Sequence, residues 1–132
     1  MSFLSRLNPE LHEGMYVFTS VPTGTDINGL AIVASMQEAE GLTLVLPEQQ
    51  ALQRGFSIQF RCAWITLRME SALDTVGLTA AFARALADQS ISCNVVAGTY
   101  HDHLFVPLDR AEVALQCLRE LQRGANNNCD SN

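Results

Sequence analysis

The sequence has few basic residues and no long apolar run near its start. Eight Lys and Arg residues stand against fourteen Asp and Glu residues, which gives a formal net charge of −6. This surplus of negative charge disfavours non-specific binding to nucleic acid or to an anionic membrane. Residues 1–10 contain no apolar stretch that suits a secretory signal or a membrane span. We therefore expect a cytoplasmic protein that binds neither nucleic acid nor membrane.

Paired cysteines and the common catalytic motifs are also missing. The four cysteines occur singly, with no C-x-x-C pair, so their spacing predicts neither a zinc site nor a redox dithiol. There is no P-loop, no G-x-S-x-G, no dinucleotide fingerprint and no H-E-x-x-H. We therefore favour a protein that is not an enzyme and that carries no cofactor and no metal.

The 132 residues are 48% hydrophobic, which is enough for a packed core in one ordinary domain or two very small ones. β-branched and aromatic runs bounded by Pro and Gly predict strands, and apolar stripes with capping signals predict helices. The expected strands are 15–21, 30–40, 42–46, 56–69, 91–97 and 101–106, with a tight hairpin at Gly41 between the second and the third. The expected helices are 47–55, one that carries the stripe from Leu78 to Leu86, and a last one that starts near Asp109 and stops at Gly124. Residues 1–14 read as an irregular lead-in with a turn at Asn8-Pro9, and 125–132 as a disordered tail.

The second half of the chain thus reads β-α-β-β-α, and the first half reads strand, loop, hairpin, helix, strand. Residues 22–29 are too rich in Gly and Asn for a helix, so the first half lacks its first helix. Both faces of the strand around Trp64 are apolar, which suits a strand shared between two units. We expect an α+β protein with the ferredoxin-like βαββαβ arrangement, divided into residues 1–60, residues 61–124 and the tail.

Two stretches resemble the ACT domain. The first is Val-Gly-Leu-Thr-Ala-Ala-Phe at 76–82, followed by Gln-Ser-Ile-Ser-Cys-Asn-Val-Val at 89–96. The strings at 38–47 and 94–107 are more specific and resemble small bacterial tandem ACT-like proteins, a likeness that runs from Leu7 to about Leu118. It implies two ACT-like units, the first of them degenerate. It also implies a regulatory role, because ACT modules typically bind amino acids at interfaces between modules.

The start of the helix after Thr75 is the predicted ligand site. Unpaired N–H groups at a helix start attract a carboxylate, and Gly77 either lets a ligand approach them or only shapes the turn. Thr75 or Thr79 is a candidate helix cap. Asn94 either bonds the ligand or a neighbouring loop. The predicted ligand-binding residues are Val76, Gly77, Leu78, Thr79, Asn94, Val95, His101 and His103.

His101 and His103 form the most conspicuous polar pair. On one strand they would share a face, while Asp102 would point away. Two imidazoles do not complete a zinc site, so a hydrogen-bonded strand start or a pocket wall is the favoured interpretation. A pocket histidine would make binding sensitive to pH near roughly 6 to 7.

Two functions remain open on this evidence. The favoured one is a regulatory module that binds an amino acid or a related metabolite. The alternative is an oligomerisation or interaction module with no metabolite ligand, which uses sheet edges and helix faces to dimerise.

Overall fold

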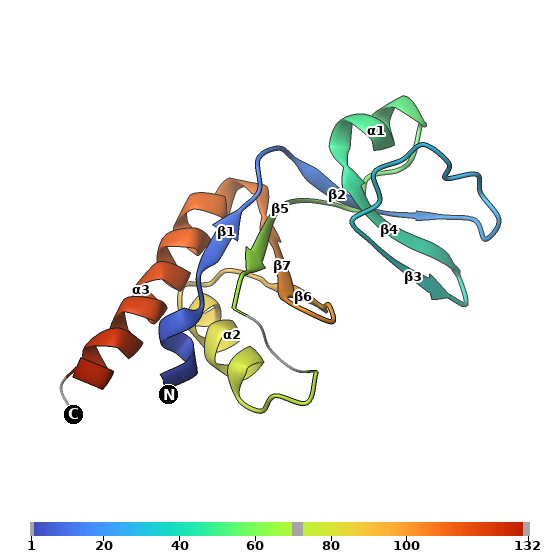
Figure 1. The fold of residues 1–132 in the computed structure, drawn as a ribbon. Helices are drawn as coiled ribbons and strands as arrows, with labels where there is room; N and C mark the ends of the chain where they lie inside the picture. Colours follow the sequence, from blue (N-terminus) through green and yellow to red (C-terminus); the bar gives the residue numbers. More distant parts are fainter. Residues whose placement is uncertain (1, 70–72, 131–132) are drawn as a thin grey trace.

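The computed structural model describes residues 2–69 and 73–130. The strands in these residues form one sheet, and the chain also has three α-helices and two short 3₁₀ helices there (Figure 1). The strands are β1 (Pro9–Leu11), β2 (Tyr16–Val21), β3 (Ala34–Glu38), β4 (Gly41–Pro47), β5 (Phe60–Leu67), β6 (Asn94–Ala97) and β7 (Asp102–Pro107). The helices are η1 (Ser2–Arg6), α1 (Glu48–Gln53), α2 (Leu78–Asp88), η2 (Leu108–Arg110) and α3 (Ala111–Asp130). No helix in the described residues is long and apolar enough to cross a membrane.

Strand β5 is shared by two four-stranded, ferredoxin-like units. The sheet order is β3-β4-β2-β5-β7-β6, and β1 also pairs with β5. The N-terminal unit is β3-β4-β2-β5, and the C-terminal unit is β1-β5-β7-β6. Residues Phe60–Cys62 of β5 pair with β2, whereas Ile65–Leu67 pair with β1 on that side. The predicted fold class, including the strand around Trp64 that serves both units, is therefore confirmed.

The start of the chain differs from the prediction. Instead of an irregular lead-in, residues 2–11 form η1 and β1, and β1 lies antiparallel to the end of β5. Strand β1 is only three residues long and includes a proline, so its own sequence does not predict a strand. Pro9 is tolerated because β1 is an edge strand, where one missing N–H costs no ladder bond. This strand is thus specified by its partner β5, and residues 2–11 pack with the C-terminal unit.

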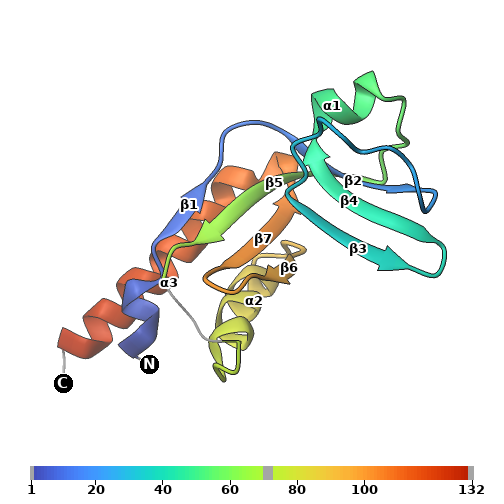
Figure 2. The same ribbon diagram turned by 45° about the vertical axis from the view of Figure 1, so that its right-hand side comes forward.

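Helices α2 and α3 cover one face of the C-terminal unit, as Figures 1 and 2 show. The predicted stripe of α2 is confirmed, because Leu78, Phe82 and Leu86 are buried. On α3, the buried residues Ala114 and Leu118 join the same core.

The expected helix stop at Gly124 is wrong, because α3 continues to Asp130. Gly and Asn are weak helix formers, but packing overrides propensity here. Ala125 is buried in the core of the C-terminal unit, and α3 lies against η1. The expected disordered tail is thus helical up to residue 130, and residues 131–132 lie outside the described residues.

The N-terminal unit has a loop where the C-terminal unit has α2. Residues 22–33 contain neither helix nor strand. The predicted loop at 22–29 is confirmed, but the strand expected over 30–40 is wrong at both ends, because β3 covers only Ala34–Glu38. The loop packs Ile27, Leu30 and Ile32 against the small core formed by β2, β4 and α1. The predicted tight hairpin at Gly41 is confirmed, because Glu38 at the end of β3 pairs with Gly41 at the start of β4. Gly41 also lies close to β2, since a Cβ there would be 2.7 Å from the carbonyl oxygen of Val21.

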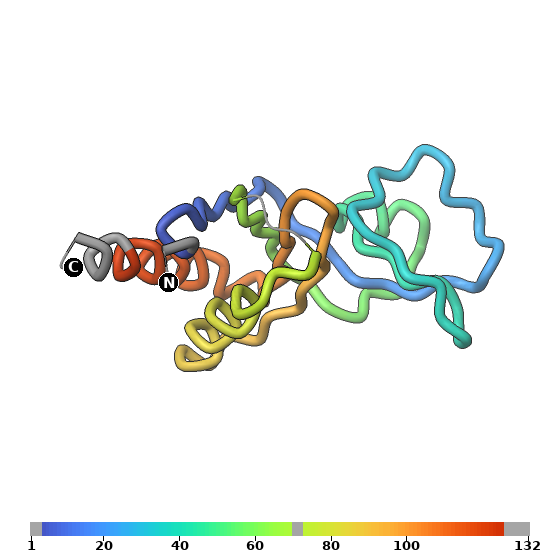
Figure 3. Tube along the Cα trace, turned by 60° about the horizontal axis from the view of Figure 1, so that its bottom comes forward, coloured from blue at the N-terminus to red at the C-terminus, as the bar shows by residue number. Residues whose placement is uncertain are grey.

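In the part of the chain that the structure describes, the C-terminal unit places no helix on the other face of the sheet (Figure 2). In Figure 3 the two units lie end to end, and α3 runs away from the N-terminal unit. Around the shared strand this open face is aromatic, and it includes Phe18, Trp64 and Phe105. Strand alternation places Ala63, Ile65 and Leu67 on the helix-covered face. The two faces of β5 therefore carry different chemistry.

Candidate functional site

The start of α2 has the features that an anion site needs. Gly77 is the N-cap residue with φ of 97°, a left-handed conformation that favours glycine. No side chain caps this helix start, so the predicted cap by Thr75 or Thr79 is wrong. The first intrahelical acceptor is the carbonyl of Gly77, which receives the N–H of Ala81. The preceding N–H groups of the first turn therefore lack intrahelical partners.

Side chains around this helix start divide sharply by exposure. Val76 is 89% exposed and Leu78 is buried, so Leu78 anchors the helix while Val76 faces solvent. Thr79 is exposed on the first turn. Thus backbone groups, and not side chains, would contact an anion here.

The strand register separates Asn94 from this helix start. Both β5 and β6 are antiparallel to β7, so they run in the same direction. Ala97 lies level with Leu67, where the chain leaves β5 toward α2, whereas Asn94 lies level with Trp64. Asn94 is therefore one strand length away from the end that leads to Gly77.

The predicted site residues also lie on two faces of the sheet. Val95 packs against the helix-covered core, so alternation places Asn94 on the open face. His103 lies on the open face with Trp64, and His101 precedes β7, where its Nδ1 is 3.3 Å from the carbonyl oxygen of Met69. The structure thus places His101 at the end of β5 that leads to α2, whereas Asn94 and His103 lie on the open face of the sheet.

A polar cluster on the open face was missed by the sequence interpretation. The indole N–H of Trp64 donates to Nδ1 of His103 at 3.0 Å, and Thr66 Oγ1 is also 3.0 Å from that nitrogen. Thr66 Oγ1 lies 2.7 Å from Nε2 of His12, and the His12 ring stacks on Trp64 with centroids 3.6 Å apart. These residues come from β5, β7 and the segment after β1. The only sequence signal for this cluster is the spacing of Trp64 and Thr66, which lie two residues apart and therefore share one face of their strand.

Burial is the main cause of the low pKa values in this cluster. Burial lowers the pKa of His103. The charges of His101, His12 and Arg68 lower this pKa further, whereas the charge of Asp102 raises it. Burial also lowers the pKa of His12, Glu10 raises it, and Arg68 lowers it. Both rings are therefore held toward their neutral forms.

Hollows flank the aromatic centre of the open face. One of about 340 Å³ is lined by Tyr16, Trp64, Pro47 and residues 31–33, where the two units meet. A smaller apolar one of about 110 Å³ lies between β3, β4 and β6, with Met36 and Val96 on its walls. Residues from both edge strands line this second hollow, so the open face is concave.

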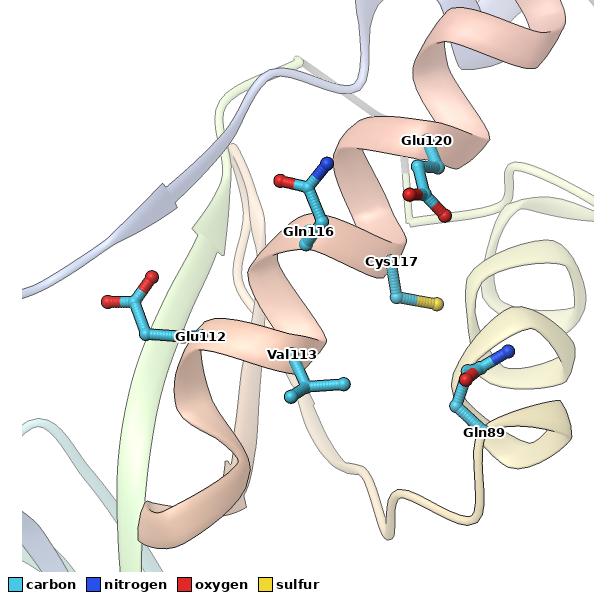
Figure 4. A pocket seen from close by; sticks show the side chains of 6 residues that line it. All are labelled: Gln89, Glu112, Val113, Gln116, Cys117 and Glu120. Atoms are coloured by element: carbon cyan, nitrogen blue, oxygen red, sulfur yellow. The ribbon is translucent and has the colours of Figure 1, made fainter.

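A further groove lies between α2 and α3 on the helical side (Figure 4). It has a volume of about 350 Å³, and its walls include Glu112 and Glu120, with Gln89 opposite. Cys117 points toward α2 and donates to the carbonyl oxygen of Ala85. Burial, followed by the charges of Glu120 and Asp88, raises the pKa of its thiol, so this cysteine is a poor nucleophile.

The thiols of Cys62 and Cys93 are also poor nucleophiles, and the described residues offer no metal centre. Burial raises the pKa of Cys62 to about 12 and that of Cys93 to about 11. Among the described residues, no group of three His, Cys, Asp or Glu side chains is placed to hold a metal ion. Nδ1 of His103 is 3.0 Å from both the indole nitrogen of Trp64 and the hydroxyl of Thr66, so His103 serves the polar cluster through this nitrogen.

Comparison with known proteins agrees with this architecture. The sequence matches the ACT domain family twice, over residues 2–63 and over residues 59–120. The two matches overlap at the start of the shared strand β5. Proteins with curated functions give no match.

Solved structures show the same two-unit fold. A protein of unknown function from Vibrio cholerae, described as a possible transport protein, is 45% identical with a TM-score of 0.84, over 92% of this chain and 94% of that one. A protein from Agobacterium tumefaciens is 17% identical with a TM-score of 0.71, over 86% and 87%. The ligand-free regulatory subunit of aspartate kinase from Thermus thermophilus is 10% identical with a TM-score of 0.66, over 88% and 97%. Together with the two family matches, these similarities show that the chain belongs to the ACT domain family and contains two ACT domains in tandem.

Proposed function

We propose that this protein is a regulatory module that binds an amino acid or a closely related metabolite. Support comes from its two ACT domains and from a fold shared with a regulatory subunit of aspartate kinase. The observation that carries the proposal is the uncapped start of α2. A ligand carboxylate would replace water on the free N–H groups there and would gain from the helix dipole.

The proposed contacts are Val76, Gly77, Leu78 and Thr79, chiefly through their backbone. His101 belongs to the same end of the C-terminal unit, since it lies against Met69 at the end of β5. Asn94, Val95 and His103 do not lie at this helix start and are left out of the proposed contact set. The site thus consists of one helix start and the turn before β7.

A thermal-shift screen with the twenty amino acids tests the function. A ligand at about one hundred times its Kd adds roughly 2.7 kcal/mol to the free energy of unfolding, so at least one amino acid at millimolar concentration should raise Tm. If none of them raises Tm, the metabolite proposal is wrong, and the interaction module becomes the better account.

A charge-swapped pair of variants at Val76 tests the location. The side chain is exposed, so both changes should leave the fold intact. Val76→Glu should weaken binding roughly fivefold, because two like charges about 4 Å apart in water repel by about 1 kcal/mol. Val76→Arg should bind at least as tightly as the unchanged protein. Leu52→Glu on α1, also exposed, is the control that should leave the Kd unchanged, and equal Kd values for all three variants would refute the location.

A further inference from the structure

Trp64 and His103 meet in a hydrogen bond whose direction is fixed by chemistry. The indole N–H can only donate, so Nδ1 of His103 must accept and carries no proton. A neutral His103 therefore carries its proton on Nε2. That atom lies beside Gly98, where a Cβ would come within 3.4 Å of it. The ring thus sits in one tautomer between the turn after β6 and Thr66.

Thr66 extends this bond to the segment that joins the two units. Its Oγ1 lies 3.0 Å from Nδ1 of His103 and 2.7 Å from Nε2 of His12, and the tautomer of His12 decides which ring nitrogen receives the hydroxyl proton. The backbone N–H of His12 also donates to the carbonyl oxygen of Trp64 at 2.9 Å. His12 lies between β1 of the C-terminal unit and β2 of the N-terminal unit. The chain of bonds therefore ends at the connection between the units.

Trp64 also connects this cluster to the N-terminal unit through ring contacts. Its ring meets Tyr16, the first residue of β2, edge to face with centroids 5.4 Å apart. Trp64 and Tyr16 also line the hollow that residues 31–33 of the N-terminal loop complete. The orientation of one indole thus shapes a cavity between the two units.

Charged groups reach this cluster from each neighbouring element. Glu10 on β1 pairs with Arg68 just beyond β5, with contacts of 2.7 and 2.9 Å. His101 and Asp102 flank His103 along the chain, and β6 brings only uncharged residues, Asn94–Ala97. Arg68, His12 and His101 act against a proton on His103, and Asp102 acts for it. Protonation of His103 therefore requires acid, and a charge on His12 opposes it.

We propose that Trp64, His103, Thr66 and His12 form an acid-sensitive latch between the two ACT units, closed when His103 is neutral and opened by a proton on its Nδ1. The hydroxyl of Thr66 can rotate to accept from a protonated ring. The indole N–H cannot reverse its role, so Trp64 loses its acceptor. Opening the latch frees the indole beside the hollow that it lines with Tyr16, and loosens the connection through His12.

The indole signal of Trp64 in an ¹⁵N-edited NMR spectrum reports the latch directly, because this is the only tryptophan in the chain. The spectrum is recorded on the full-length protein without added ligand, between about pH 8 and pH 5. We expect the indole N–H signal to move in one transition whose midpoint lies below the ordinary histidine value of about 6.5. The imidazole signals of His103 should show the same midpoint.

Matched glutamine variants assign the transition. His103→Gln keeps an oxygen that accepts from Trp64 but does not titrate, so it should abolish the movement of the indole signal. His101→Gln, which removes a neighbouring titratable ring, should retain it. Circular dichroism at pH 8 checks that each variant is folded.

Two results would overturn the latch. One is an indole signal that stays in place while His103 titrates in the unchanged protein, which needs no variant. The other is a folded His103→Gln variant in which the transition keeps its size and midpoint. Neither result bears on the proposed function, which rests on the start of α2 and is measured by amino acid binding.

Discussion

The two units of this protein reach the same strand arrangement with very different helical support. In the C-terminal unit the crossover after β5 contains α2, of 11 residues, and the 20-residue α3 packs beside it. In the N-terminal unit the crossover after β2 is the loop of residues 22–33, and α1 has only 6 residues. The comparison shows that the sheet order does not require a helix in the crossover.

This loop has no internal helical hydrogen bonds, and side chains in α1 and just after it hold the loop instead. Gln50 Oε1 accepts from the N–H of Ala31 at 2.7 Å. Arg54 donates to the carbonyl oxygens of Asp26 and Asn28 at 3.1 and 2.6 Å. These bonds satisfy backbone groups that a helix would pair internally. The loop also buries part of its apolar side chains, Ile27 among them.

The largest expected effect sharpens this contrast between helix and loop. Phe82 on α2 is fully buried, whereas Ile27 in the loop is only partly buried. Phe82→Ala should lower the free energy of unfolding by about 3–5 kcal/mol, and Ile27→Ala by only about 1 kcal/mol, because the loop can relax around the smaller side chain. Urea unfolding followed by circular dichroism measures both. Equal losses would mean that the loop is as rigid a part of the core as α2.

A middle-sized effect tests how the loop is held. Arg54→Met keeps much of the side-chain length but removes both hydrogen bonds to the loop, and should cost about 1–2 kcal/mol. Hydrogen exchange should speed up in residues 22–33 and stay unchanged in α2. Arg84→Met is the matched control, because Arg84 is exposed and makes only a 3.9 Å contact with Asp88. If hydrogen exchange in the loop does not change in Arg54→Met, the hydrogen bonds of Arg54 do not hold it.

The smallest expected effect is a pH dependence of stability that arises from histidines of the C-terminal unit and of the segment that joins the two units. All three histidines lie outside residues 16–59 of the N-terminal unit. The pKa values of His12 and His103 are lowered by folding, so the unfolded chain binds their protons more readily. Their contribution to stability is complete above about pH 6.5 and is lost as pH falls through the lower folded pKa values. Urea midpoints at pH 8, 6.5 and 5 should show this decline, and the double variant His12→Gln/His103→Gln should flatten it. A decline that persists unchanged in the double variant would assign it to other groups.

Much of this fold follows from local sequence patterns. The stripe on α2, the turn at Gly41 and the apolar faces of the strand around Trp64 each predict an element that the structure contains. The absence of a helix in 22–29 follows from the Gly and Asn content there. These features depend on residues that are neighbours along the chain, so the sequence displays them directly.

The elements that escaped prediction depend on distant partners. Strand β1 exists because β5 offers an edge to Pro9–Leu11. Helix α3 passes Gly124 because Ala125 meets a core built largely from other elements. The cluster around His103 joins residues from β5, β7 and the segment after β1, which no spacing rule connects. The predicted grouping of Asn94 with Gly77 is also wrong. The position of Asn94 along β6 and the sheet face that it occupies depend on strand pairing, which the sequence does not display.

The most direct test of the proposed function compares amide signals in the two crossovers during a titration. The amino acid that gives the largest thermal shift is added to ¹⁵N-labelled protein, and amide shifts are followed in the first turn of α2 and in residues 22–33. We predict that the largest saturable shifts occur at Leu78, Thr79 and Ala80, with little change in the loop. Saturable shifts confined to the loop, or to the open sheet face around Trp64, would contradict the proposed site.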